Sequence, residues 1–112
     1  MLVYVAGKIK GCDRKETIAK FEAAREWLEG QGHEVLVPTV LPVLSSMSDD
    51  NYLHVCYAMI DCADCIYMLN DWQHSQGARK ELQYASDWRK EIIYQDKMTV
   101  EENYPIIHGG RY

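Results

Sequence analysis

The stretch that decides the fold reads Cys65-Ile-Tyr-Met-Leu-Asn-Asp-Trp-Gln-His-Ser-Gln-Gly-Ala-Arg-Lys-Glu81. It opens as a short apolar run typical of a buried strand and then passes into a helix for which Ser75 is a suitable N-cap. Free N–H groups and the helix dipole at such a start favour an anion, so Ser75, Gln76 and Gly77 are expected to cradle a phosphate. Glu81 follows Ser75 by about 9 Å along the helix axis, which suits an anchored phosphate and a reacting sugar.

Strand-like and helical patterns alternate along the rest of the chain. Apolar runs at residues 2–6, 34–37, 64–69 and 91–94 predict strands. Three helices are expected between them, beginning at Asp13, at Asp49 or Asp50, and at Ser75. The side chains expected on their inner faces are Ile18, Phe21, Ala24 and Leu28, then Tyr52, Val55, Cys56, Met59 and Ile60, then Ala78, Leu82 and Ala85.

This alternation predicts an α/β fold with a single doubly wound domain, flavodoxin-like or Rossmann-like. Parallel strands need right-handed crossover connections, and the simplest arrangement is a parallel sheet of four or five strands in the order 2-1-3-4. Ligands then bind beyond the carboxyl ends of the first and third strands, where the winding reverses. The loops expected there are residues 7–11 and 70–77, so topology and chemistry select the same segments.

Composition limits the function. The chain has 112 residues, 47% of them hydrophobic, which fits one soluble domain. Twelve Lys and Arg against 17 Asp and Glu give a net charge of −5, without a basic cluster, so a nucleic-acid polymer is a disfavoured partner. We find neither a signal peptide nor an apolar run long enough to cross a membrane, so we expect no membrane partner and a cytoplasmic location.

The cysteines have two interpretations. Cys62 and Cys65 form a C-x-x-C pattern, which could mark a redox or metal pair. These two residues straddle a predicted helix end and strand start, and no second ligand pair follows. We therefore expect buried apolar thiols, no metal site and no cofactor.

The loop Gly7-Lys-Ile-Lys-Gly11 has two glycines and two ammonium groups and is a candidate phosphate grip, although a turn with solvated lysines has the same pattern. Glu81 is expected near the inner face of its helix, where desolvation would raise its pKa, and the alternative is a surface glutamate. Trp72 either stacks on a base or covers the strand end. His74 either donates to an anion or is solvated, and Arg79 is expected at the surface.

Three elements of the sequence carry a family resemblance. They are Tyr4-Val-Ala-Gly-Lys-Ile-Lys-Gly11, Asp64 at the start of an apolar strand, and Trp72-x-x-Ser75-x-Gly77-Ala78-x-x-Glu81 with Ala85. Over residues 1–94 the chain resembles the nucleoside 2-deoxyribosyltransferase-like superfamily, in particular its small uncharacterised branch, and it is similar to the 2'-deoxynucleoside 5'-monophosphate N-glycosidases.

The resemblance implies a role for two residues. Glu81 matches the family nucleophile, which attacks the anomeric carbon and holds the deoxyribosyl group. Ser75 matches the phosphate-contacting serine of the monophosphate branch, whereas nucleoside transferases carry an acidic residue there, so a nucleotide is favoured over a nucleoside. The resemblance also implies a homo-oligomer, a dimer or higher, in which a neighbouring subunit helps to close the site.

One departure from the family pattern puts catalysis in question. The family usually carries an aspartate eight residues before Asp64, where this chain has Cys56. A thiol is mostly neutral at pH 7 and does not supply the charge of a carboxylate. Asp71 lies nearer to the expected site than Asp64, and Tyr52 is one helical turn from Cys56, so either is a candidate replacement.

The leading hypothesis is an N-glycosidase or deoxyribosyltransferase acting on a small nucleoside or nucleotide. A non-catalytic nucleotide-binding or regulatory module on the same scaffold is the second hypothesis, and a C-x-x-C redox or zinc protein is the third. Residues 1–94 would form the domain and residues 95–112 a tail that either packs on a neighbouring subunit or stays mobile. The candidate catalytic residues are Glu81 and Asp71, and the candidate substrate-binding residues are Tyr4, Gly7, Lys8, Ile9, Lys10, Gly11, Cys56, Trp72, Ser75 and Gly77.

Overall fold

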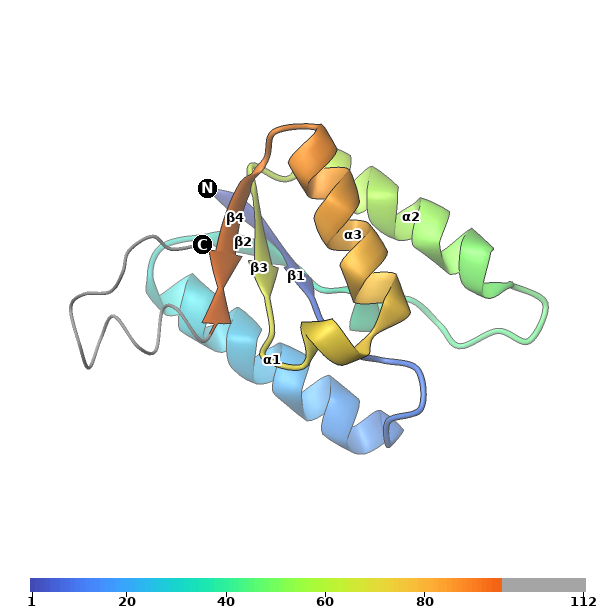
Figure 1. Cartoon of the computed structure of the whole chain (residues 1–112). Helices are drawn as coiled ribbons and strands as arrows, with labels where there is room; N and C mark the ends of the chain where they lie inside the picture. The colour runs from blue at the N-terminus through green and yellow to red at the C-terminus, as the bar shows by residue number, and fades with distance from the viewer. Residues whose placement is uncertain (96–112) are drawn as a thin grey trace.

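The computed structural model describes residues 1–95 and contains four strands and three α-helices (Figure 1). Two single 3₁₀ turns, η1 and η2, lie in the connecting loops. In chain order the elements are β1 (Leu2–Ala6), α1 (Arg14–Gly30), β2 (Glu34–Leu36), η1 (Pro38–Val40), α2 (Asp49–Cys62), β3 (Cys65–Met68), η2 (Trp72–His74), α3 (Gln76–Asp87) and β4 (Glu91–Tyr94).

The strands form one parallel sheet in the order β2-β1-β3-β4. The predicted doubly wound α/β topology is therefore confirmed, with four strands among residues 1–95. β1 and β3 are neighbours at the centre, with Tyr4 opposite Ile66 in the register. Their trailing loops consequently leave the same edge of the sheet side by side, as a topological switch point requires.

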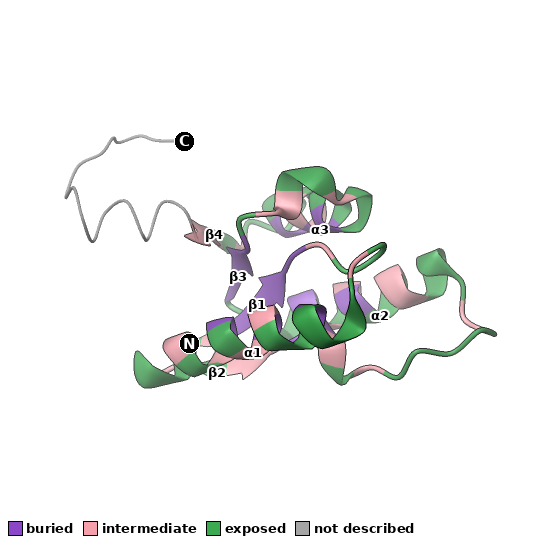
Figure 2. Ribbon diagram, turned by 90° about the horizontal axis from the view of Figure 1, so that it is seen from below, coloured by how far each residue is buried: buried purple, intermediate pink, exposed green. Residues whose placement is uncertain are grey.

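Helices cover both faces of the sheet, with α1 on one face and α2 and α3 together on the other (Figure 1). Successive side chains of a strand point to opposite faces, so β1 contributes Val3 and Val5 to the α1 face and Tyr4 and Ala6 to the other. Figure 2 shows the burial concentrated in the central strands and on the inward sides of the helices.

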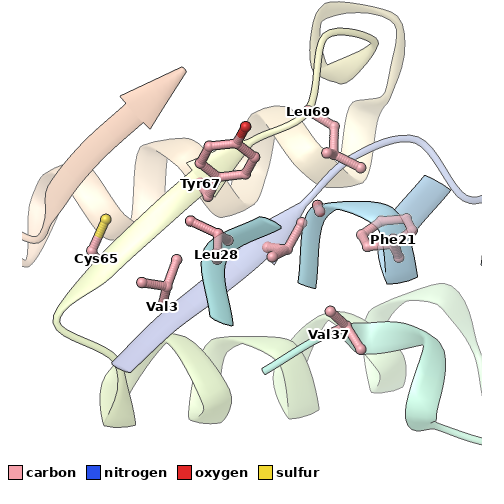
Figure 3. Close-up of a cluster of buried hydrophobic side chains, with 9 residues drawn as sticks. Val3, Phe21, Leu28, Val37, Cys65, Tyr67 and Leu69 are labelled. Atoms are coloured by element: carbon pink, nitrogen blue, oxygen red, sulfur yellow. The ribbon is translucent and has the colours of Figure 1, made fainter. Parts of the chain in front are cut away.

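The α1 face is an apolar core. Phe21 and Leu28 of α1 share one buried cluster with Val3 of β1 and Tyr67 of β3, and these residues are labelled in Figure 3. The side chains that complete this cluster are Val5, Ala24, Val37, Cys65 and Leu69. Burial of such side chains is the main favourable term in folding, so this face anchors the domain.

Some local predictions are wrong. Ser48 caps α2, with its hydroxyl accepting the Asn51 N–H, whereas Asp49 and Asp50 lie in the first helical turn. Ile18 is 38% exposed, and Thr17 takes the buried position because its hydroxyl donates to the Asp13 carbonyl oxygen in the preceding turn. Such a bond satisfies the hydroxyl within its own helix.

Further differences concern Val55 and the thiols. Val55, expected on the inner face of α2, is exposed at the surface. Cys56 and Cys65 are buried as expected, but Cys62 is exposed and Cys12 is half-buried. All four cysteines are free thiols.

The described chain ends just after β4. Residue 95 is the only part of the predicted 95–112 tail within it, and the rest of that prediction lies outside the described residues. In residues 1–95 no helix combines the length and apolar character needed to span a membrane.

Candidate active site

A cavity of about 480 Å³ lies beyond the carboxyl ends of β1 and β3, where the sequence analysis expects a ligand. We call it the switch-point cavity. Its walls come from the β1–α1 loop, the β2–α2 loop, α2 and the start of α3. The lining residues are Gly7, Lys8, Ile9, Lys10, Arg14, Pro38, Leu41, Pro42, Val43, Asp49, Asp50, Tyr52, Leu53, Cys56, His74, Ser75, Gln76, Gly77, Ala78, Lys80 and Glu81.

Gly7 allows the two loops of the switch point to approach closely. The Leu69 N–H donates to the Ala6 carbonyl oxygen at 2.8 Å, so the chain after β3 runs against the end of β1. A Cβ atom at residue 7 would meet Leu69 side-chain carbons at 2.7 to 3.1 Å, closer than van der Waals contact permits. Residue 7 therefore has to be a glycine for the two loops to pack this closely. The loop residues that follow it line the cavity.

Ser75 caps α3 as predicted. Its Oγ accepts the Ala78 N–H at 3.0 Å, which fixes the first turn of the helix at the cavity wall. The N–H groups of Gln76 and Gly77 have no acceptor within the described part of the chain. These donors and the positive helix end suit an anionic group.

Glu81 lies one and a half turns further along α3 and is only 6% exposed. One of its oxygens, Oε2, accepts a 2.7 Å hydrogen bond from the Tyr4 hydroxyl, and the side chain lines the cavity. Burial raises the pKa of Glu81 to about 7, while hydrogen bonds from Tyr4 and Cys56 act in the opposite direction. The predicted inward position and raised pKa are both present, so Glu81 is a carboxylate that titrates near neutral pH.

Tyr4 and Cys56 flank this carboxylate. Burial, followed by the charge of Glu81, raises the pKa of the Tyr4 hydroxyl well above its ordinary value. Burial likewise raises the pKa of the Cys56 thiol to about 12 with a contribution from Glu81. Both groups therefore stay protonated at neutral pH, and each can donate to Glu81. Cys56 lines the cavity, whereas Tyr4 is fully buried behind Glu81.

Cationic residues also line the cavity. The Lys10 ammonium pairs with the Asp49 carboxylate at 2.6 Å in an exposed ion pair that joins the β1–α1 loop to α2. The Arg14 guanidinium donates to the Thr39 carbonyl oxygen at 3.2 Å. Lys8 and Lys80 are on the same cavity wall, and their ammonium groups have no ion-pair partner within the described residues, so a bound anion could compensate their charge.

The structure does not bring all predicted site residues to the cavity. Gly11 and Trp72 do not line it, and the Trp72 ring instead lies 5.8 Å from the Tyr94 ring, centre to centre, over the strand end. Asp71 is also outside the cavity wall, because Oδ1 accepts the Lys8 N–H and Oδ2 accepts the Lys20 ammonium. Eight residues of the candidate catalytic and substrate-binding set line the cavity, as does Gln76 of the expected phosphate cradle; the eight are Glu81, Gly7, Lys8, Ile9, Lys10, Cys56, Ser75 and Gly77.

The β2–α2 loop was missed by the sequence analysis. Leu41, Pro42 and Val43 form an apolar wall, and Val43 is 76% exposed. The Tyr52 hydroxyl holds this loop by donating to the Pro42 carbonyl oxygen and accepting the Leu44 N–H. The one available signal was the run of apolar residues between Pro38 and Leu44 in a segment expected to be a loop. Val43 and Leu44 are thus exposed apolar side chains at the rim of the cavity or beside it.

The fold and this arrangement define a class: a doubly wound α/β domain with a buried carboxylate and a cation-bearing loop around one cavity. A family model described as "Domain of unknown function (DUF4406)" matches residues 1–94, and the chain belongs to that family. A comparison with curated proteins gives no match.

Proposed function

We propose that this protein is an N-glycosidase or deoxyribosyltransferase that acts on a small (deoxy)nucleotide, with Glu81 as the nucleophile. The observation that carries the proposal is the buried Glu81 carboxylate, which accepts a hydrogen bond from Tyr4 and borders the switch-point cavity. The helix start at Ser75 and the ammonium of Lys8 on the same cavity support a phosphate-bearing substrate.

The proposed reaction has two steps. In the first, an ionised Glu81 oxygen forms a bond to the anomeric carbon while the bond from that carbon to the base nitrogen breaks, and the base leaves with the bonding electrons and takes up a proton. In the second, water or another base attacks the same carbon and releases Glu81 as a carboxylate. Hydrolysis or transfer follows according to which acceptor enters.

The environment of Glu81 fits this role. A carboxylate with a pKa near 7 is more basic than an exposed one, and the fraction ionised at neutral pH is still substantial. The Tyr4 hydroxyl stabilises the ionised form and also fixes the direction in which the second oxygen points. A positioned carboxylate and an anchored phosphate would together hold the sugar for attack.

We place the base against the apolar wall of Leu41, Pro42 and Val43. This wall belongs to the same cavity as Glu81, whereas Trp72 packs over the strand end. A planar base would cover side chains that are otherwise exposed, Val43 above all. The carboxylates of Asp49 and Asp50, also on the cavity wall, can accept hydrogen bonds from amino groups of a base.

The test is incubation with a panel of 2'-deoxynucleoside and nucleoside 5'-monophosphates and chromatographic detection of free base. We expect release from at least one deoxynucleotide and a loss of about a thousandfold or more in Glu81→Gln. Glu29→Gln changes an exposed glutamate on α1 and serves as the matched control with unaltered rate. Release that persists in Glu81→Gln contradicts the proposed nucleophile.

Cys56 favours a second candidate function, a nucleotide-binding or regulatory module without turnover. Its thiol stays neutral beside Glu81, so residue 56 does not supply the second carboxylate that would assist the leaving base. Calorimetric binding of a nucleotide with no base released, in the wild-type chain and in a Cys56→Asp variant, would select this alternative. Base release that increases in Cys56→Asp would select the enzyme.

Assembly is a separate prediction. A homo-oligomer follows from the resemblance alone, and light scattering of the full chain checks it. A monomer that releases base at the full rate would show that a single chain completes the site.

A further inference from the structure

Asp71 makes an unusual set of contacts for a residue outside the cavity. Its Oδ1 accepts the backbone N–H of Lys8 at 2.9 Å, and its Oδ2 lies 2.5 Å from the Lys20 ammonium. The same ammonium donates to the Lys8 carbonyl oxygen at 2.6 Å. Both backbone polar groups of Lys8 are thus held by one ion pair.

This ion pair joins three segments that are distant in sequence. Lys20 comes from α1, Asp71 precedes η2 and the Ser75 cap, and Lys8 belongs to the β1–α1 loop. Both charged side chains are about 30% exposed, which leaves the pair only partly screened by water. The loop that carries Lys8 and the helix start that carries Ser75 are thereby fixed relative to each other.

We propose that Lys20 and Asp71 are positioning residues that shape the β1–α1 loop for a phosphate and so set the preference for a phosphorylated substrate. The proposal rests on the proposed function, because it concerns the phosphate end of the same cavity. It gives Asp71 an indirect role through Lys8 in place of direct contact with the substrate.

Geometry supports positioning over simple charge. A lone carboxylate in contact with the β1–α1 loop would repel a phosphate bound by that loop, but Lys20 neutralises Asp71. A hydrogen bond from a backbone N–H to a charged acceptor is also stronger than one between neutral groups. The pair therefore orders the loop while adding no net charge near the anion.

The two explanations make opposite predictions for Asp71→Ala. Removal of a negative charge alone would tighten phosphate binding, whereas loss of the loop anchor would weaken it. In the double variant Lys20→Met with Asp71→Ala, the net charge equals that of the wild type. If Asp71 acted only through its charge, the double variant would bind the phosphate with wild-type affinity. If the ion pair positions the loop, the double variant binds it weakly.

The experiment compares calorimetric binding of a 2'-deoxynucleoside 5'-monophosphate with that of the matching nucleoside, on the full chain. We expect Asp71→Ala and the double variant to raise the Kd of the monophosphate about tenfold, and the Kd of the nucleoside less than twofold. Lys20→Arg should recover most of the affinity lost in Lys20→Met. Glu22→Ala removes an acidic partner of an ion pair on the same helix, away from the loop, and is the control with unchanged affinity.

Two results overturn the proposal. One is monophosphate binding by Asp71→Ala as tight as in the wild type or tighter, and the other is an equal loss for both ligands. Wild-type protein that binds the monophosphate but releases no base contradicts catalysis while leaving positioning intact. Should the wild type bind neither ligand, the proposed nucleotide site fails. Amide hydrogen exchange at Lys8 then decides whether the pair shapes the loop, with faster exchange expected in Asp71→Ala and unchanged exchange contradicting it.

Discussion

The two faces of the sheet are built from the same strands but do different things. On the α1 face, Phe21, Leu28 and Val3 belong to one apolar cluster (Figure 3). On the opposite face, the cluster beneath α2 and α3 contains Tyr4 and borders the buried carboxylate of Glu81. A buried ionisable group costs stability, whereas an apolar cluster adds it. Both faces bury apolar side chains, but only the second also buries the carboxylate on which the proposed reaction depends.

Phe21→Ala should have the largest effect and is aimed at the apolar face. Phe21 is fully buried, so its truncation removes apolar burial and leaves a cavity, at a cost of about 4 kcal/mol in the free energy of unfolding. Urea denaturation measures it. Ile18→Ala on the same helix is the control and should change stability by less than about 0.5 kcal/mol. Equal losses in both variants would contradict the assignment of the α1 face as the anchor.

Glu81→Gln probes the cost of the carboxylate on the other face. The pKa of Glu81 is raised from 4.5 to about 7 in the folded state. Between these two pH values the folded protein keeps a proton on Glu81 that the unfolded chain has lost. The stabilisation from the protonated group is complete below pH 4.5 and is lost as the pH rises to about 7.

Glutamine at residue 81 stays neutral at every pH, so the variant does not lose stability in this way as the pH rises. Glu81→Gln should therefore be more stable than the wild type at pH 8 by up to about 3 kcal/mol, and close to it below pH 4.5. Denaturant unfolding of both proteins across this range measures the gap. A gap that does not vary with pH would show that Glu81 does not titrate as a buried group.

Tyr4→Phe tests how the Tyr4 hydroxyl affects the pKa of Glu81. The Tyr4 hydrogen bond lowers the pKa of Glu81 relative to burial alone, so its removal should raise that pKa further above 7. Carbon-13 NMR of the glutamate carboxyl groups follows the titration, with Glu81→Gln identifying the signal. The pH at which base release reaches half its maximum should move upward by the same amount. A lowered pKa would contradict the proposed role of Tyr4.

Ser75→Ala should have the smallest effect on stability. Loss of the N-cap bond to Ala78 costs about 1 kcal/mol. Ser46→Ala in the exposed turn before α2 is the matched control, with no expected change. Thermal unfolding compares the two. A cost far below that of other N-caps would show that the hydroxyl is not held by Ala78 in solution.

The sequence predicted much of this architecture because its signals are local. Residues 91–94 were expected as a strand and form β4, and the Ser75 cap and the buried Glu81 were expected from a few residues of spacing. The strand order follows from the crossover rule once the elements are known.

The features that the sequence did not predict are of two kinds: some have several equally good local candidates, and others join residues that are far apart in the chain. Ser48, Asp49 and Asp50 are all good N-caps, so local preference could not choose among them. The bond between Tyr4 and Glu81 joins residues 77 positions apart, and no local pattern encodes it. The contacts of Asp71 with Lys8 and Lys20 likewise appear only after folding.

The proposed reaction requires that an ionised Glu81 carboxylate traps the sugar. Its most direct test is mass spectrometry of the protein after brief incubation with a reactive deoxynucleotide and an acid quench. We expect the peptide that contains Glu81 to gain the mass of the substrate less its base, and no gain in Glu81→Gln. Rapid base release without an adduct, or an adduct on another residue, would show that Glu81 is not the nucleophile.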